Sequence, residues 1–169
     1  MAQSTPPPAH TRVTLLSDAS TIVPGQPFTV AIVFKMDPTW HVYFKDPGDS
    51  GLPPSVKWTL PEGLTAGELK FPKPEVLKGP AGTNFVYHDE VALLMTMTPG
   101  KEFRIGRAVE IAAALKWLEC DADTCVPQKQ TAALTVTADE QVTPTHTEEF
   151  KAWREKVKEG ESFDPATAK

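Results

Sequence analysis

The sequence predicts an all-β protein, folded as an antiparallel β-sandwich with a short C-terminal helix. Short apolar or alternating segments recur along the chain, separated by turn residues roughly every ten positions. Proline accounts for 17 of the 169 residues, and each proline removes a backbone donor, which disfavours long helices. No helical periodicity separates the apolar segments, so alternating βαβ units are excluded and a sandwich is favoured.

The strands are predicted from apolar patterns bounded by Pro, Gly, Asp and Asn. The segment 28–34 shows the clearest alternation, with a large apolar side chain at every second position after the turn at Pro24–Pro27. The other predicted strands are Thr11–Leu16, Trp40–Phe44, Ser55–Trp58, Glu68–Phe71, Glu90–Met97, Arg107–Leu118 and Thr131–Val136.

The strand at 40–44 is predicted to carry two kinds of side chain. Alternation places Trp40, Val42 and Phe44 on one face. His41 and Tyr43 then point to the other face. One set can fill the core while the other meets a functional edge.

The C-terminal segment follows a different pattern. Thr147 can cap a helix, and Phe150, Trp153 and Val157 fall on one side at i, i+3 and i+7. Gly160 ends this helix, and we expect the residues after it to fray. The chain therefore divides into a disordered tail at 1–10, one domain at 11–140, and a helix with a linker at 141–169.

Composition and charge restrict the possible functions. Asp and Glu number 22 against 17 Lys and Arg, a net charge of −5, which disfavours a nucleic-acid partner. The longest mainly apolar stretch, 109–118, is too short to cross a bilayer. The N-terminus lacks a signal peptide but resembles the polar, proline-rich start of a mature exported protein, so we expect an export signal to have been removed.

The two cysteines, Cys120 and Cys125, are the most informative residues. They lie five positions apart between two strand-like segments, so a disulfide at the turn is geometrically plausible. A structural staple of this size would contribute only about 2 kcal/mol of loop entropy. Such a small loop opens and closes at little cost, so a redox role is the first hypothesis and a staple the second.

The immediate neighbours of the cysteines are acidic. Glu119, Asp121 and Asp123 should hold the thiol pKa at or above its usual value unless a cation lies closer in space. This pattern indicates a passive relay that waits for the activated thiolate of a partner.

A metal site is the third hypothesis for this region. His41 and His88 could join the cysteines, and Met95 and Met97 could add soft ligands for Cu(I). The histidines are isolated in the sequence, and core packing explains the two methionines more simply.

Several motifs, in order, carry a resemblance to a known family. The chain resembles the periplasmic N-terminal domain of the thiol:disulfide interchange protein DsbD, and within that family the branch of ScsB-like reductases. The motifs are Trp40–Pro53, Trp58–Gly63, Phe71–Pro74, Phe85–Val91 and Trp117–Pro127.

The resemblance implies an immunoglobulin-like sandwich that acts as a periplasmic protein-disulfide reductase domain. Electrons would arrive from a membrane-embedded reductase domain and leave to periplasmic thioredoxin-like proteins, with no bound cofactor and with the domain as a monomer. Cys125 would form the mixed disulfide with the outgoing partner, and Cys120 would resolve it. The rival hypothesis is a noncatalytic β-sandwich that binds copper or a protein and holds a structural disulfide.

The resemblance also implies an aromatic cap over the disulfide, at Phe85. Tyr87, His41, Tyr43 and Trp117 would line the same site. Where better-known members carry two acidic residues before the capping ring, this chain has Thr83–Asn84, and we expect Asp121 and Asp123 to take over thiol protection.

Overall fold

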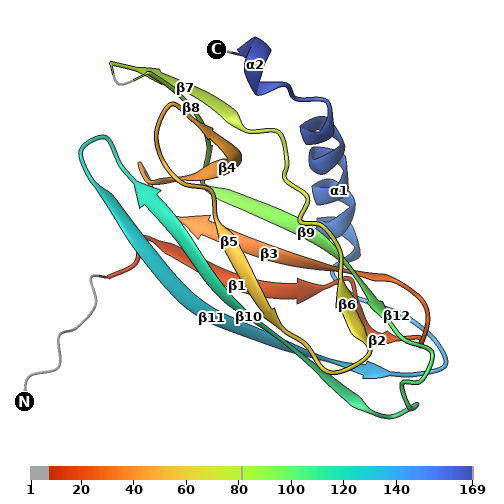
Figure 1. The fold of residues 1–169 in the computed structure, drawn as a ribbon. Helices are drawn as coiled ribbons and strands as arrows, with labels where there is room; N and C mark the ends of the chain where they lie inside the picture. Colours follow the sequence, from red (N-terminus) through yellow and green to blue (C-terminus); the bar gives the residue numbers. More distant parts are fainter. Residues whose placement is uncertain (1–7, 81, 169) are drawn as a thin grey trace, which may run out of the picture.

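The computed structural model describes residues 8–80 and 82–168, and it has the predicted all-β, immunoglobulin-like fold (Figure 1). Two sheets of mainly antiparallel strands face each other, and a helix packs on one of them. The strands are β1 (Thr11–Ser17), β2 (Ala19–Ile22), β3 (Phe28–Met36), β4 (His41–Gly48), β5 (Ser55–Thr59), β6 (Leu64–Ala66), β7 (Glu75–Gly79), β8 (Gly82–His88), β9 (Glu90–Pro99), β10 (Ala108–Cys120), β11 (Cys125–Ala138) and β12 (Thr143–Pro144), and the helices are α1 (Thr147–Glu161) and α2 (Pro165–Ala168).

The smaller sheet has the order β1-β3-β9-β6, and the larger has β12-β2-β11-β10-β4-β8-β7 with β5 paired to β10. Apolar side chains from both sheets fill the space between them. Burial of this apolar surface provides the main favourable contribution to folding. The central cluster includes Val13, Ile32, Phe34, Val42, Phe44, Phe85, Tyr87, Leu93, Leu115 and Trp117.

Helix α1 covers the outer face of the smaller sheet, as Figure 1 shows. Phe150, Trp153 and Val157 are buried against that sheet, which confirms the predicted apolar side of the helix. The N-cap is His146, in the left-handed conformation and without a side-chain cap, so the predicted capping by Thr147 is wrong. No helix among residues 8–80 and 82–168 is long and apolar enough to span a bilayer.

The structure differs from the prediction in three segments. Glu68–Phe71 forms only an isolated bridge, from Lys70 to Leu94. The β7–β8 hairpin was not predicted, because Pro72, Pro74 and Pro80 interrupt the pattern around it. Strand β11 starts at Cys125, six residues before the predicted Thr131.

The described parts of both predicted tails pack against the domain. The ring of His10 stacks on Trp40 with ring centres 3.9 Å apart, so the end of the predicted disordered tail is part of the fold. Residues 1–7 of that tail lie outside the described residues. Phe163 packs edge-on against Phe44 and Phe85, which corrects the expected fraying after α1.

Candidate redox site

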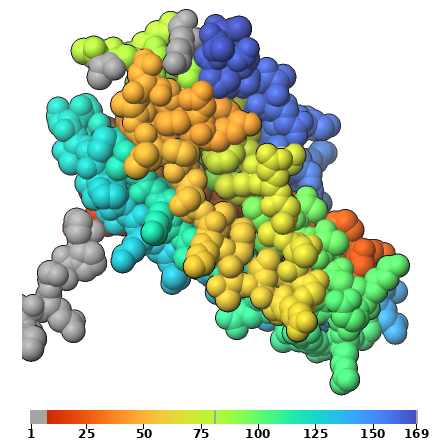
Figure 2. Space-filling view, viewed as in Figure 1, coloured from red at the N-terminus to blue at the C-terminus, as the bar shows by residue number. Residues whose placement is uncertain are grey.

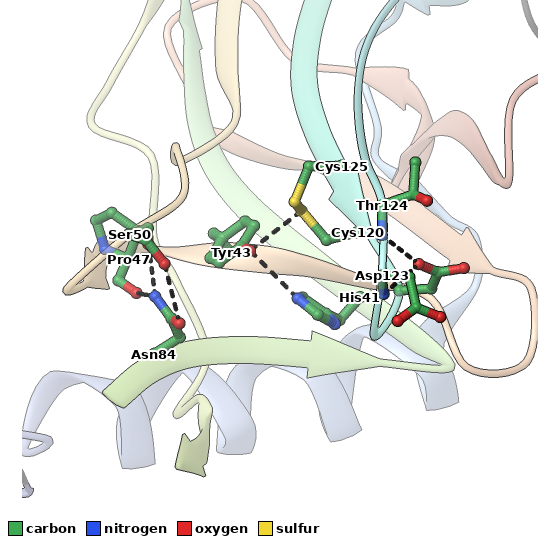
Figure 3. The surroundings of a disulfide bond; sticks show 10 residues. His41, Tyr43, Pro47, Ser50, Asn84, Cys120, Asp123, Thr124 and Cys125 are labelled. Atoms are coloured by element: carbon green, nitrogen blue, oxygen red, sulfur yellow. Dashed lines mark hydrogen bonds between the residues drawn. A yellow bond between two sulfur atoms is a disulfide. The ribbon is translucent and has the colours of Figure 1, made fainter. Parts of the chain in front are cut away.

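The site lies where β10 ends and β11 begins, at one end of the larger sheet. The two strands pair in continuous register from Ala108↔Thr137 to Cys120↔Cys125. The cysteines are thus the last pair of a long hairpin, and a disulfide joins them (Figure 3). Because paired residues point to the same face of a sheet, the hairpin itself brings the two sulfurs together.

The turn between the cysteines is organised by Asp121. Its Oδ1 accepts hydrogen bonds from the backbone N–H groups of Asp123, at 2.9 Å, and Thr124, at 2.7 Å. These bonds hold the pKa of the Asp121 carboxyl below its ordinary value, so it is ionised at neutral pH. An aspartate bonded to the backbone two and three residues ahead is a local turn device, which explains the tight connection.

The two cysteines differ in accessibility. Cys120 is 1% exposed and packs with Tyr43, Val86 and Leu118. Cys125 is exposed. An external thiolate can therefore reach Cys125, while Cys120 is shielded by the sheet.

Tyr43 contacts the buried sulfur. Its O–H donates a hydrogen bond of 3.2 Å to the Sγ of Cys120, and His41 Nε2 lies 3.3 Å from the same phenol oxygen (Figure 3). Burial raises the pKa of the Tyr43 phenol above its ordinary value, so the phenol keeps its proton and can donate it.

His41 lies between Tyr43 and His88. Burial lowers the pKa of its imidazole, the neighbouring His88 lowers it further, and Asp121 raises it. The rings of His41 and His88 are 5.5 Å apart, and His88 is hydrogen-bonded to Glu75 on β7. The lowered pKa keeps His41 neutral at pH 7, with its Nε2 within hydrogen-bond distance of the Tyr43 hydroxyl.

A loop between β4 and β5 packs over Tyr43. Gly51 has φ +94°, and a Cβ there would lie 2.4 Å from the Tyr43 ring, so this position requires glycine. Asn84 fixes the loop, because its Nδ2 donates to the carbonyls of Pro47, at 2.9 Å, and Ser50, at 2.5 Å. The loop thus presses on the ring that contacts the sulfur.

The opposite side of the hairpin end holds a buried carboxylate. Glu119 is 0% exposed and accepts hydrogen bonds from Trp117 Nε1, at 3.0 Å, and from the backbone N–H of His10, at 2.7 Å. Gln128 Nε2 adds a third bond at 3.4 Å. Glu119 directly precedes Cys120 and therefore holds the backbone at His10 against the end of the hairpin.

The predicted lining residues separate into two groups. His41 and Tyr43 lie on the disulfide face, as the alternation of the strand predicted. Trp117 lies on the inner face with Phe34, so it supports the hairpin from the core.

Phe85 and Tyr87 require a correction. Val86 is the residue of β8 that pairs with Tyr43 and shares the disulfide face, so its two neighbours point the other way. Phe85 is 0% exposed in the central core, and the Tyr87 hydroxyl donates to the Pro72 carbonyl at 2.6 Å. Neither ring is placed to cover the disulfide.

Of the potential metal ligands, the two methionines lie away from the disulfide. Met95 and Met97 are buried in the sandwich core. Within residues 8–80 and 82–168, no group of three or more His, Cys, Asp or Glu side chains is arranged to hold a metal ion.

Sequence reasoning named Glu119 only as an acidic neighbour of the thiols and Asn84 only as a departure from the family pattern, and it gave Gly51 no role in the site. Gly51 carries a signal, since it follows Pro47 and Gly48 in a turn-rich segment. Asn84 and Glu119 act through contacts with residues 34 to 109 positions away. No local pattern shows such contacts.

Comparisons with known proteins identify a family and solved structures of similar fold. The chain is similar to the N-terminal periplasmic domain of ScsB from Proteus mirabilis, with 14% identity, a TM-score of 0.63, and coverage of 93% of this chain and 57% of that one. The chain thus spans little more than half of that domain. It is also similar to the reduced DsbD N-terminal domain of Neisseria meningitidis, with 16% identity, a TM-score of 0.42, and coverage of 79% and 90%.

No curated protein matches the chain. The family described as "Thiol:disulfide interchange protein DsbD, N-terminal" matches residues 12–137, which is most of the sandwich and includes both cysteines. This chain belongs to the family of the DsbD N-terminal domain.

Proposed function

We propose that this domain is a periplasmic thiol–disulfide exchange module that relays electrons through Cys120 and Cys125. The donor would be a membrane-embedded reductase domain, and the acceptors would be thioredoxin-like proteins. The observation that carries the proposal is the pairing of an exposed Cys125 with a buried Cys120 whose sulfur accepts a hydrogen bond from Tyr43. Thiol–disulfide exchange needs one accessible sulfur and one stabilised leaving sulfur, and no cofactor.

Loading of the domain begins at the accessible sulfur. A partner thiolate attacks Sγ of Cys125, the Cys120–Cys125 bond breaks, and its electron pair leaves on Sγ of Cys120. The Tyr43 O–H points at this sulfur and stabilises the thiolate. The proton lost by the attacking thiol balances the proton that Cys120 gains. A second partner thiolate then attacks the partner sulfur of the mixed disulfide, and Cys125 leaves and becomes a thiol.

Delivery reverses these steps. The Cys125 thiolate attacks the disulfide of an acceptor and forms a mixed disulfide, and Cys120 attacks Cys125 to release the reduced acceptor. Two electrons pass to the acceptor and the domain disulfide re-forms. This order assigns contact with partners to Cys125 and resolution to Cys120.

A likeness to a second structure guides the choice of partner for a test. A solved structure describes the complex between the DsbD N-terminal and the PilB N-terminal domains of Neisseria meningitidis, and the matched chain is 17% identical to this chain. The PilB domain is thus a practical probe for exchange.

Single cysteine variants test the proposal. Cys120→Ala should trap a mixed disulfide between Cys125 and the probe, and Cys125→Ala should give neither a trapped complex nor turnover. Mass spectrometry under non-reducing conditions measures the complex. If the disulfide of the unaltered domain resists both the probe and dithiothreitol, the bond is a structural staple and the proposal is wrong.

A further inference from the structure

The outer face of the larger sheet carries three lysines on the strands that adjoin or form the disulfide hairpin. Lys57 on β5, Lys116 on β10 and Lys129 on β11 are all exposed. Lys116 pairs with Lys129, and Lys57 pairs with Ala114, two residues from Lys116 on the same strand. Residues paired across strands share a face, and so do alternate residues along a strand, so the three ammonium groups form one patch.

This lysine patch lies on the same face as the buried sulfur. Lys116 and Cys120 are four residues apart on β10, about 13 Å at the rise of a strand. Leu118 lies between them and pairs with Pro127. With Leu52 and Pro53, these residues line a groove of about 880 Å³ that Lys116 and Lys129 also border. An apolar centre with charged groups at its rim is the usual composition of a protein–protein interface.

No ion pair compensates the lysine patch in the part of the domain that the structure describes. Like charges directly opposite each other on neighbouring strands are destabilising. None of the ion pairs that the structure shows among residues 8–80 and 82–168 includes Lys57, Lys116 or Lys129. The chain as a whole carries a net charge of −5, so a patch of three cations is a departure from its average surface.

The carboxylates of the same face lie at its two ends. Glu110 is four residues from Ala114 on β10, and Asp121 and Asp123 belong to the turn beyond the sulfurs. The face is thus acidic at the turn and basic along the hairpin. Figure 2 shows β5 and the β10–β11 hairpin at the molecular surface, whereas α1 covers the smaller sheet.

An acidic protein partner fits this pattern better than a nucleic acid or an anionic lipid surface. Three lysines neutralise few phosphates, and the acidic turn would repel a nucleic-acid backbone. A lipid surface would use the lysines but would give no reason for their place beside a redox-active sulfur. A protein that exchanges disulfides must dock next to Cys125, and the lysine patch and groove lie there.

We propose that the lysine patch docks a redox partner that carries two or more carboxylates about 13 Å from its reactive cysteine. This inference rests on the proposed exchange function and specifies the partner's surface. The lysines attract the partner's carboxylates, and Asp121 and Asp123 repel them from the turn. The two effects together orient the partner's cysteine toward Cys125.

Two synthetic peptides of equal spacing test whether the carboxylates speed the reaction. In acetyl-Cys-Gly-Ser-Gly-Glu-Glu-amide the first carboxylate is four residues from the thiol, a span of about 13 Å when extended. The control replaces both glutamates with glutamines. The measured quantity is the second-order rate constant for mixed-disulfide formation on Cys125. The acidic peptide should react at least about threefold faster at 10 mM salt, and the difference should disappear at 300 mM salt.

Two triple variants place the effect on the lysine patch. K57Q/K116Q/K129Q should abolish the preference for the acidic peptide. K101Q/K151Q/K156Q changes the net charge equally at exposed positions elsewhere and should keep it. Equal rates for both peptides on the unaltered domain would overturn the docking inference while leaving exchange itself supported.

Two other results would also overturn the inference. If neither peptide reacts, the proposed exchange function fails and the docking inference fails with it. If phosphatidylglycerol vesicles bind the unaltered domain and K57Q/K116Q/K129Q loses that binding, the patch serves a lipid surface.

Discussion

Strands β4, β8 and β10 have two faces that perform different tasks. The inner face carries Phe44, Phe85 and Trp117, which are nearly fully buried between the sheets. The outer face carries Tyr43 and Cys120, with His41 and His88 at its edge. Adjacent residues of one strand thus serve stability on one side and sulfur chemistry on the other.

This comparison shows why position along the chain is a poor guide to a site in a β-protein. A shift of one residue moves a side chain to the opposite face of the sheet. Phe85 is next to Val86, which packs with Cys120, yet its ring lies in the core. Substitutions on the two faces should therefore have separable effects.

The largest effect is expected on the inner face, from Phe85→Ala. Removal of a fully buried phenylalanine should lower the free energy of unfolding by about 3–5 kcal/mol, measured by urea denaturation. The rate of disulfide reduction by dithiothreitol should not change in conditions where the variant is folded. A faster reduction in a variant of normal stability would show that Phe85 covers the disulfide after all.

The next effect is expected on the outer face, from Tyr43→Phe. The variant loses the O–H that donates to Cys120 Sγ. A hydrogen bond to a charged group contributes about 1.5–3 kcal/mol, so departure of the Cys120 thiolate should slow by about 10- to 100-fold. Stopped-flow reduction by dithiothreitol measures this rate.

Tyr87→Phe is the matched control for this change. Tyr87 is also buried and hydrogen-bonded, but its hydroxyl donates to the Pro72 carbonyl on the inner side. It should lose about 1 kcal/mol of stability and keep the rate of exchange. Equal slowing in both tyrosine variants would contradict the assignment of the two faces.

A smaller effect concerns pH and His41. Its folded-state pKa is lowered, first by burial and then by His88. As pH falls below about 6.5, the unfolded chain takes up a proton on this imidazole while the folded domain does not, so stability decreases until the folded-state pKa is passed. His41→Gln should remove this decrease, as seen in urea midpoints between pH 7.5 and 5.

Asp121 provides an internal reference for that titration. Its lowered pKa stabilises the fold above the unfolded value of about 3.9, and this contribution is lost as pH falls through the folded-state pKa. His41→Gln should leave this more acidic limb intact, as seen in urea midpoints extended below about pH 4. If the variant removes both limbs or neither, His41 is not the group that titrates.

Local patterns were enough to predict much of the fold. They were also enough to predict that the two cysteine sulfurs lie close together. Alternation from Phe28 to Phe34 and spacing in Phe150, Trp153 and Val157 are local signals, and the structure confirms both. The separation of His41 and Tyr43 from Val42 follows from the same period of two. Two strands that flank Cys120 and Cys125 were enough to predict their proximity.

What could not be predicted depends on contacts between distant residues. The segment around Phe85 has an interrupted pattern, so no strand was predicted there and no face could be assigned. Its orientation is set by the pairing of Val86 with Tyr43. Likewise, Glu119 is buried because the backbone of His10, 109 positions away, supplies a hydrogen bond.

The smallest effect is expected from Asn84→Ala, which releases the loop over Tyr43. Loss of the bonds to Pro47 and Ser50 should lower the free energy of loop opening by about 1 kcal/mol. The equilibrium constant for opening then rises about fivefold. Amide exchange at Asp49, whose N–H donates to the Thr83 carbonyl, measures it. Ser50→Ala removes only the 3.2 Å bond to Asn84 Oδ1 and should have a smaller effect.

This loop covers Tyr43, whereas Cys125 is exposed without any opening. Reduction by dithiothreitol should therefore keep its rate in Asn84→Ala even though the loop opens more often. If the rate instead rose with the opening measured at Asp49, an attacking thiol would have to enter beneath the loop. Access to the disulfide would then be controlled by the outer-face loop, and the exposed position of Cys125 would not be sufficient for exchange.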